Sequence, residues 1–206
     1  MPDIPLLVVA LAISAYWLRV GAMVVRARRR QHRDVGVVPE RSGERVMWLV
    51  FVPLVAAWCA LPWLGLTHAS GWLAAPSFAH EVPYAWLRWA FAAIAVICLA
   101  LTIDCWRKMG RNWRMDISDS NTALVTEGLF ARIRHPIYAF SIAMMIATAV
   151  VLPTAAMIAI AIVHIVLMNV KARREETHLA RMHGEAYARY VERTGRFLPA
   201  FAARHS

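Results

Sequence analysis

Long apolar runs alternate with shorter arginine-rich segments along the whole chain. An α-helix needs about 20 largely apolar residues to cross the hydrocarbon core of a bilayer. Five runs reach or approach this length: Ile4–Val25, Val46–Leu66, Tyr84–Trp106, Ile137–Leu152 and Thr154–Val170. The pattern therefore predicts an all-α, polytopic integral membrane protein with about five transmembrane helices.

Pro153 separates the last two runs, which are the shortest. Backbone that faces lipid cannot leave polar groups unpaired, so both runs are expected to be helical. One broken helix through both runs would be far longer than a bilayer requires. We therefore expect a tight helical hairpin with its turn at Pro153.

The 23 Lys and Arg residues are concentrated in three segments between or after the apolar runs. Residues 26–45 contain seven of them, residues 107–136 contain six and residues 171–206 contain eight. Basic residues that flank membrane spans collect on the cytoplasmic side. This predicts an outer N-terminus and a cytoplasmic C-terminus, in a multi-pass protein of a bacterial inner membrane. The other two, Arg19 and Arg88, lie near span ends, from which long side chains reach the interface.

The composition supports a membrane protein, with 60% hydrophobic residues, 17% charged residues and a mean hydropathy of +0.48. A net charge of +10 would also suit a nucleic-acid-binding protein. The basic residues, however, lie between apolar runs, as expected for loops against an anionic leaflet. We therefore expect membrane lipids as partners and no nucleic acid, while the oligomeric state is left open.

The segment after Val170 has a different character. Leu179, Met182, Tyr187 and Tyr190 recur at helical spacing, and charged residues occupy the opposite face. This predicts a cytoplasmic C-terminal amphipathic helix that lies on the bilayer or folds back under the bundle. Gly184 is a candidate position for a bend.

Candidate chemistry lies at the inner ends of the last two runs. Pro136 suits the first turn of a helix, and a helix N-terminus offers free N–H groups to anions. His135 and Tyr138 are three residues apart and share one helix face. Glu175 and Glu176 follow the fifth run among basic residues, an arrangement that a plain solvated face would also show.

Three stretches follow one another in the order LVTxGxxxxxRHPxY, EExxL, and GExYxxY with a closing RFLP. This ordered set, around a short membrane hairpin, resembles the isoprenylcysteine carboxyl methyltransferase family and its phospholipid methyltransferase relatives. The resemblance covers about residues 110–199. We accordingly divide the chain into N-terminal transmembrane helices, residues 1–106, and a methyltransferase region, residues 107–206.

The resemblance implies transfer of a methyl group from S-adenosyl-L-methionine to a lipophilic acceptor that enters from the bilayer, with no metal. The cofactor-binding positions that it implies are Thr122, Ala123, Leu124, Val125, Phe130, His135, Pro136, Ile137, Tyr138 and Glu175. Thr122 and Ala123 precede the matched LVT run, so they rest on position alone. The expected catalytic residues are Lys171, Arg173 and Glu175.

The acceptor is not determined by these motifs. Lys171 stands where eukaryotic members of the family carry an Arg associated with the substrate carboxylate, and the nearby Arg173 and Arg174 favour an anionic acceptor. A phospholipid amine and a small-molecule thiol are the alternatives, and so is a non-catalytic membrane protein that retains the fold. Asp104, His164 and Tyr187 each have a functional and a purely structural interpretation; for Asp104 the structural one is an ion pair with Arg107.

Overall fold

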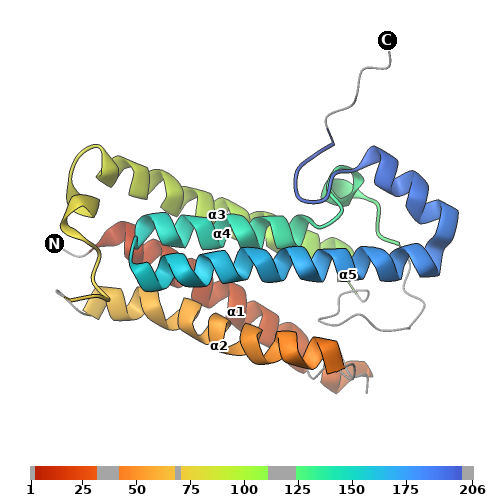
Figure 1. Cartoon of the computed structure of the whole chain (residues 1–206), viewed down its shortest axis with the longest axis horizontal. Coiled ribbons are helices and arrows are strands. Elements are labelled where there is room, and N and C mark those ends of the chain that lie inside the picture. Colours follow the sequence, from red (N-terminus) through yellow and green to blue (C-terminus); the bar gives the residue numbers. More distant parts are fainter. Residues whose placement is uncertain (1–2, 32–41, 68–70, 111–123, 201–206) are drawn as a thin grey trace, which may run out of the picture.

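The computed structural model describes residues 3–31, 42–67, 71–110 and 124–200. Five long helices run side by side in one elongated bundle (Figure 1). They are α1 (Ile4–Gln31), α2 (Ser42–Thr67), α3 (Tyr84–Met109), α4 (Pro136–Val151) and α5 (Ala155–Arg193), with short 3-10 turns η1 (Ser77–His80) and η3 (Gly128–Ala131). Because the described residues contain no strand, the all-α prediction is confirmed.

The helices have the lengths and surfaces of membrane spans. Four of them, α1, α2, α3 and α5, contain segments that are long and apolar enough to cross a bilayer. The fifth, α4, is apolar but has only 16 residues, about 24 Å at the helical rise and slightly less than the hydrocarbon core. Large apolar side chains such as Leu18, Leu49 and Ile162 are exposed on the outside of the bundle, as expected where lipid is the solvent. The protein is therefore a polytopic membrane protein.

The predicted hairpin between α4 and α5 is confirmed. The turn spans residues 152–154, and Thr154 caps α5 because its hydroxyl accepts a hydrogen bond from the Met157 N–H at 3.2 Å. At the other end of the turn, the Leu152 N–H donates to the Thr148 carbonyl at 2.8 Å. The Tyr84 hydroxyl and Arg88 Nε of α3 donate to the Val150 and Val151 carbonyls at the end of α4, so the turn and α3 together pair these backbone groups, as an apolar environment requires.

The segment after Val170 differs from the prediction. It is not a separate helix, because α5 continues without a break in hydrogen bonding until a kink at Gly184, where φ is 49°. A glycine tolerates this left-handed conformation without steric cost. The kink changes the phase of the helix, and as a result Tyr187 and Tyr190 are buried whereas Met182 is 38% exposed. The predicted apolar face is therefore only partly formed.

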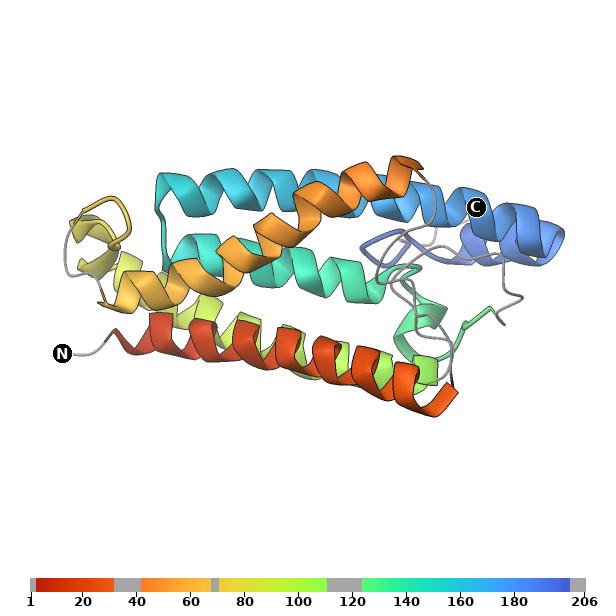
Figure 2. The same ribbon diagram turned by 90° about the horizontal axis from the view of Figure 1, so that it is seen from below.

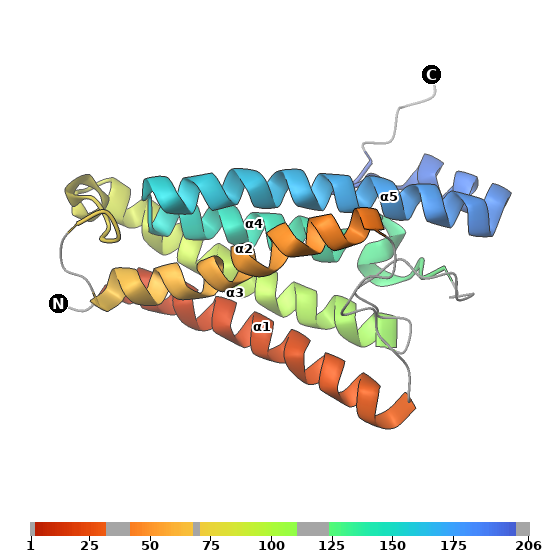
Figure 3. The same cartoon turned by 60° about the horizontal axis from the view of Figure 1, so that its bottom comes forward.

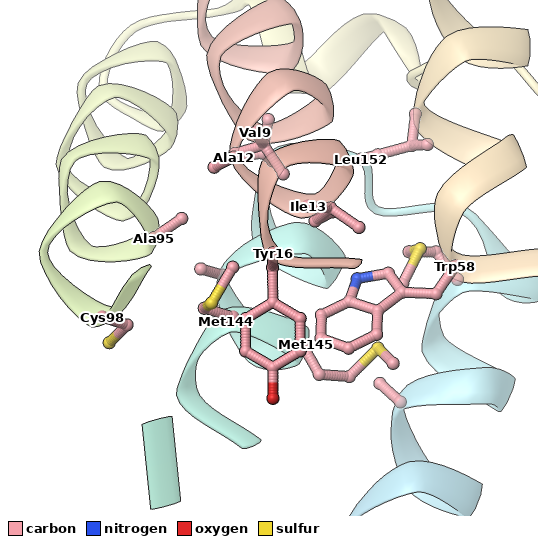
Figure 4. Packing of buried hydrophobic residues seen from close by; sticks show 14 of the residues in the cluster. Val9, Ala12, Ile13, Tyr16, Trp58, Ala95, Cys98, Met144, Met145 and Leu152 are labelled. Atoms are coloured by element: carbon pink, nitrogen blue, oxygen red, sulfur yellow. The ribbon is translucent and has the colours of Figure 1, made fainter. Parts of the chain in front are cut away.

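Packing within the bundle joins all five helices. The most extensive helix–helix contact is between α3 and α4. Helix α1 packs against α2, α3 and α4, and α2 packs against α5. Figures 2 and 3 show that α2 crosses the bundle obliquely. One core cluster draws on every helix, and Figure 4 shows Tyr16 between Met144 and Trp58 at its centre. The ends of α1, α3 and α5 and the start of α4 lie towards the same end of the bundle, where α1 diverges from α5 (Figures 1 and 3).

At the opposite end, Arg88 ties several elements together instead of reaching outward. Its side chain is only 3% exposed and forms an ion pair with Asp3. Its Nε donates to the Val151 carbonyl at 2.8 Å, and Nη1 lies 3.3 Å from His80 Nδ1. The expectation that Arg88 extends to the interface was wrong, because a buried guanidinium is stable when all its N–H groups find partners.

Asp104 has the structural role, but with a different partner from the one expected. Its carboxylate pairs with Lys108, one helical turn away, at 2.6 Å, and not with Arg107. Both side chains are more than one third exposed. The pair is an ordinary surface ion pair, which contributes little to stability.

Candidate active site

The site is built where two distant segments meet at one end of the bundle. Residues 132–135 run parallel to residues 195–196, with an isolated bridge between Ile133 and Gly195. The Arg134 N–H donates to the Gly195 carbonyl at 2.8 Å, and the His135 N–H donates to the Arg196 carbonyl at 3.0 Å. The RFLP motif therefore holds the backbone of the RHPxY motif directly.

Glycine is required at the centre of this junction. A Cβ atom added to Gly195 would lie 1.9 Å from the carbonyl oxygen of Leu198. Such a contact is far inside van der Waals distance, so any other residue would force residues 195–198 to move. The tight turn after α5 thus depends on the missing side chain.

His135 stands at the N-cap position of α4, with Pro136 as the first helical residue. Pro136 is where the sequence predicted it, since its missing N–H costs nothing in the first turn. The His135 side chain makes no capping hydrogen bond. Instead its ring stacks on that of Tyr138, with centroids 5.3 Å apart and planes 2° apart. The shared helix face of these two residues is confirmed.

Glu175 and Lys171 complete this group from α5. The Tyr138 hydroxyl donates to Glu175 Oε2 at 2.9 Å, and the same oxygen lies 3.6 Å from His135 Nδ1. Lys171 Nζ lies 5.6 Å from the centre of the Tyr138 ring, within the range of a cation–π interaction. Residues His135, Tyr138, Lys171 and Glu175 form one cluster, which we call the His135 cluster.

Glu176 is the charged centre of the junction. Arg134 Nε donates to Oε1 at 3.0 Å, and Arg196 donates from Nε at 3.0 Å and from Nη2 at 2.6 Å. Burial on its own would raise the pKa of this carboxyl group, but the interactions with His135, Arg196 and Arg134 lower it well below its usual value. The carboxylate is therefore ionised throughout the physiological range.

The contacts of Glu176 did not follow from its place in the sequence, where a solvated face was the favoured interpretation. The signal that was available is charge complementarity. Each of the flanking motifs, RHPxY and RFLP, contributes an arginine, and a carboxylate between them in space satisfies both. A bidentate fork of this kind is the strongest form of arginine–carboxylate contact.

Two tyrosines after the Gly184 kink also face the junction. The Tyr190 hydroxyl donates to the Phe130 carbonyl at 2.6 Å. Tyr187 is buried, and its hydroxyl has no hydrogen-bond partner among the described residues. Burial, reinforced by the nearby charge of Glu176, raises the pKa of Tyr187. A second buried atom, His135 Nε2, lies 3.4 Å from Glu176 but also lacks a hydrogen bond. Buried polar atoms without partners are expected where a polar ligand binds.

The remaining predicted positions differ in their surroundings. Phe130 and Pro136 are buried, Ile137 is half-buried, and Leu124 and Val125 are half-buried in the extended segment before η3. Arg173 is exposed, and no hydrogen bond or ion pair among the described residues joins its side chain to the His135 cluster. Thr122 and Ala123 lie outside the described residues, so their cofactor role stays a prediction.

A cavity lies next to this cluster, between the helices. We call it the α1–α2 cavity. Tyr138 and Lys171 of the His135 cluster form part of its wall. Its walls are mostly apolar and aromatic, and all five long helices contribute to them: Tyr16, Trp17, Val20, Phe51, Trp106, Ile137, Ser141 and Met168. A polar cluster with an apolar channel beside it is the usual composition of a small-molecule site.

A comparison of the sequence with known protein families identifies the part of the chain that carries most of this site. Residues 87–186 match the phospholipid methyltransferase family. This region is a phospholipid methyltransferase domain. The match confirms the resemblance seen in the motifs, and the family includes membrane methyltransferases of the isoprenylcysteine carboxyl type. No curated protein matched the chain.

The methyltransferase domain contains most of the site but not all of it. It includes α3, α4 and α5 to just beyond the Gly184 kink, and hence the whole His135 cluster. It begins earlier than the predicted boundary and ends before the RFLP motif. Helices α1 and α2 lie outside the match, although they form much of the wall of the α1–α2 cavity.

Proposed function

We propose that this protein is an S-adenosyl-L-methionine-dependent methyltransferase that acts on a lipophilic acceptor drawn from the bilayer. The observation that carries the proposal is the position of the His135 cluster. It lies in a methyltransferase domain, at the end of a lipid-facing bundle, where buried polar atoms adjoin an apolar cavity. A polar cofactor and an apolar acceptor can therefore meet there.

The residues of the cluster suit the cofactor. Glu175 is an acceptor for an ammonium group or a ribose hydroxyl, and it is one third exposed, as access from water requires. His135 Nε2 and the Tyr187 hydroxyl are two of the buried atoms that lack a hydrogen-bond partner among the described residues, and both can hydrogen-bond to a carboxylate or ribose oxygen. The Tyr138 ring already has Lys171 near it, so its electron-rich ring is suited to cations, including a sulfonium.

When bound, S-adenosyl-L-methionine supplies an electrophilic methyl group. The protein has to hold the acceptor atom in line with that group and exclude water from it. Orientation of this kind can lower a barrier by several kcal/mol, up to about 7–11 kcal/mol in ideal cases. The stacked His135 and Tyr138 rings and the hydrogen bond from Tyr138 to Glu175 fix the cluster in advance, and the apolar walls of the cavity exclude water.

An acidic acceptor is favoured by Lys171, which lines the cavity. An ammonium there attracts a carboxylate and repels a cationic amine. A phospholipid amine and a thiol are the alternative acceptors. Radiolabelled methyl transfer from the cofactor into an extract of total membrane lipids, followed by separation of lipid classes, distinguishes the three.

Cofactor binding is tested by calorimetric titration of the detergent-purified protein with S-adenosylhomocysteine. We expect binding by the wild type and a loss of at least tenfold in His135→Ala and Glu175→Ala. Glu185→Ala, which removes an exposed carboxylate beyond the kink, is the matched control and should bind as the wild type does. Absence of binding by the wild type, or equal binding by all four proteins, rejects the proposal in favour of a non-catalytic membrane protein with this fold.

A further inference from the structure

Besides Tyr138 and Lys171, the α1–α2 cavity is lined by two residues with hydroxyl groups. Tyr16 and Ser141 both line the cavity, and they are only 6% and 4% exposed. The Tyr16 hydroxyl interacts with that of Ser141. Figure 4 shows the same hydroxyl directed away from Val9 and Ala12. The two hydroxyl groups therefore come together deep inside the bundle, from α1 and α4.

A buried histidine supports this pair from behind. Ser141 Oγ lies 3.0 Å from His164 Nε2, and His164 is fully buried. The Trp58 ring packs over the imidazole with centroids 5.1 Å apart. His164 Nδ1 has no hydrogen-bond partner among the described residues. His164 does not line the cavity itself, so its effect there is exerted through Ser141.

A count of donors and acceptors shows what this arrangement offers a ligand. A buried N–H without a partner is rarer in proteins than a buried acceptor without one. The proton of His164 is therefore placed on Nε2, from which it is donated to Ser141 Oγ. A serine hydroxyl has one proton and two lone pairs. His164 occupies one lone pair of Ser141, and the hydrogen bond between Tyr16 and Ser141 uses one of their two hydroxyl protons. One hydroxyl proton of the pair therefore remains for an oxygen atom in the cavity.

The volume of the cavity limits which ligands can enter it. The cavity has a volume of about 70 Å³. On the same measure of volume, one water molecule needs about 10–15 Å³. The cavity thus has room for about five to seven groups of the size of a water molecule. A single chain or a small ring fits this space, whereas the paired acyl chains of a phospholipid do not.

We propose that the α1–α2 cavity binds the part of the acceptor next to the methylated group, and that Ser141 and Tyr16 recognise a hydroxyl or carbonyl oxygen in it. The acceptor is then a single-chain or single-ring amphiphile, not a two-chain phospholipid. This inference deepens the proposed function and rests on it for the methylated group. The cavity's preference for an oxygen-bearing single chain is measurable without methyl transfer.

The test uses three photoactivatable probes on the full chain in detergent. One is a long-chain alcohol with a diazirine close to the hydroxyl, the second is the matching hydrocarbon, and the third is a diacyl phosphatidylcholine with the diazirine in one acyl chain. Mass spectrometry then locates the label. We expect the alcohol to label the segments around Tyr16 and Ser141 several times more strongly than either other probe.

Substitutions decide whether the Tyr16 and Ser141 hydroxyl groups cause this preference. In Ser141→Ala and Tyr16→Phe, labelling by the alcohol should fall by about threefold to tenfold, as expected for one lost hydrogen bond. Ser14→Ala and Tyr84→Phe are matched controls. Ser14 accepts a bond from Trp63, and Tyr84 donates one to the Val150 carbonyl, both away from the cavity. Neither control should alter labelling.

Several outcomes overturn the inference: equal labelling of the cavity by the phosphatidylcholine probe, no labelling of the cavity by the alcohol, or unchanged labelling in both variants. Titration of each variant with S-adenosylhomocysteine serves as the check on folding, because Tyr16 and Ser141 lie outside the His135 cluster. Failure of the wild type to bind S-adenosylhomocysteine, together with selective labelling by the alcohol, rejects the cofactor proposal and leaves the cavity assignment standing.

Discussion

Replacing Glu176 by glutamine tests whether the junction between residues 132–135 and 195–196 depends on one carboxylate. The substitution preserves shape but removes the charge that pairs with Arg134 and Arg196. One of the two side-chain oxygens becomes an NH₂ group, which cannot accept the bonds from Arg196. The perturbation is thus confined to the centre of the junction.

The magnitude follows from the hydrogen bonds that are lost. A bond to a charged group contributes roughly 1.5–3 kcal/mol, and Glu176 accepts such bonds from both arginines at 2.6–3.0 Å. The Glu176 side chain is 15% exposed and that of Arg196 is 32% exposed, so water recovers part of the loss. We expect the junction to weaken by about 2–4 kcal/mol, which is about 30-fold to several hundred-fold in its opening equilibrium.

Amide hydrogen exchange measures this opening directly. The N–H groups of Arg134, His135 and Gly195 are hydrogen-bonded across the junction, and they exchange only when it opens. Their exchange should accelerate by the factor above in Glu176→Gln. Arg196→Lys, which keeps the charge but loses the guanidinium fork, should show a smaller effect.

The matched control is Glu185→Gln, whose carboxylate pairs with Arg189 at 3.5 Å on a largely exposed surface. A surface pair contributes at most about 1 kcal/mol, so exchange across the junction should change by less than about fivefold. If Glu176→Gln changes the exchange of these three amides no more than Glu185→Gln does, the electrostatic account of the junction is wrong.

Three other predictions concern the same fold. Gly195→Ala should weaken S-adenosylhomocysteine binding at least tenfold, measured by calorimetry, because its Cβ would collide with the Leu198 carbonyl. Arg88→Ala should lower the free energy of unfolding by about 3–5 kcal/mol, seen as a lower thermal midpoint in detergent, because it leaves the Asp3 carboxylate without its partner. Because the pKa of Glu176 is lowered by folding, its contribution to stability should be complete above the usual carboxyl range near pH 4.5 and should decrease as the pH falls below it. The difference in thermal stability between the wild type and Glu176→Gln should therefore be constant from pH 8 to about pH 5 and should narrow steadily as the pH falls towards 3. A difference that stays constant across pH 3–8 would contradict this linkage.

Hydropathy was enough to predict the helices, because lipid imposes one requirement on every span. Pro153 and the length of the two short runs were enough for the hairpin. The extent of α5 was not predictable in the same way. A helical pattern of charged and apolar residues after Val170 is the same whether the helix continues from the span or starts afresh, and only Gly184 marks a break.

Contacts between distant segments were the part that the sequence did not disclose. Asp3 and Arg88 are far apart in the chain, and each alone has an ordinary surface interpretation. The motifs placed His135, Tyr138 and Glu175 together correctly. Nothing in α1 resembled a motif, so the contribution of Tyr16 to the cavity appeared only when the helices were packed.

The pairing of residues 132–135 with residues 195–196 also sets an order of assembly. Residues 195–196 come after every membrane helix in the chain, and a ribosome therefore releases them after all five helices have been made. Until residues 195–196 dock against residues 132–135, the His135 N–H lacks its hydrogen-bond partner, the Arg196 carbonyl. A nascent chain that has already inserted its five described helices would thus still lack the hydrogen bonds that order the start of α4.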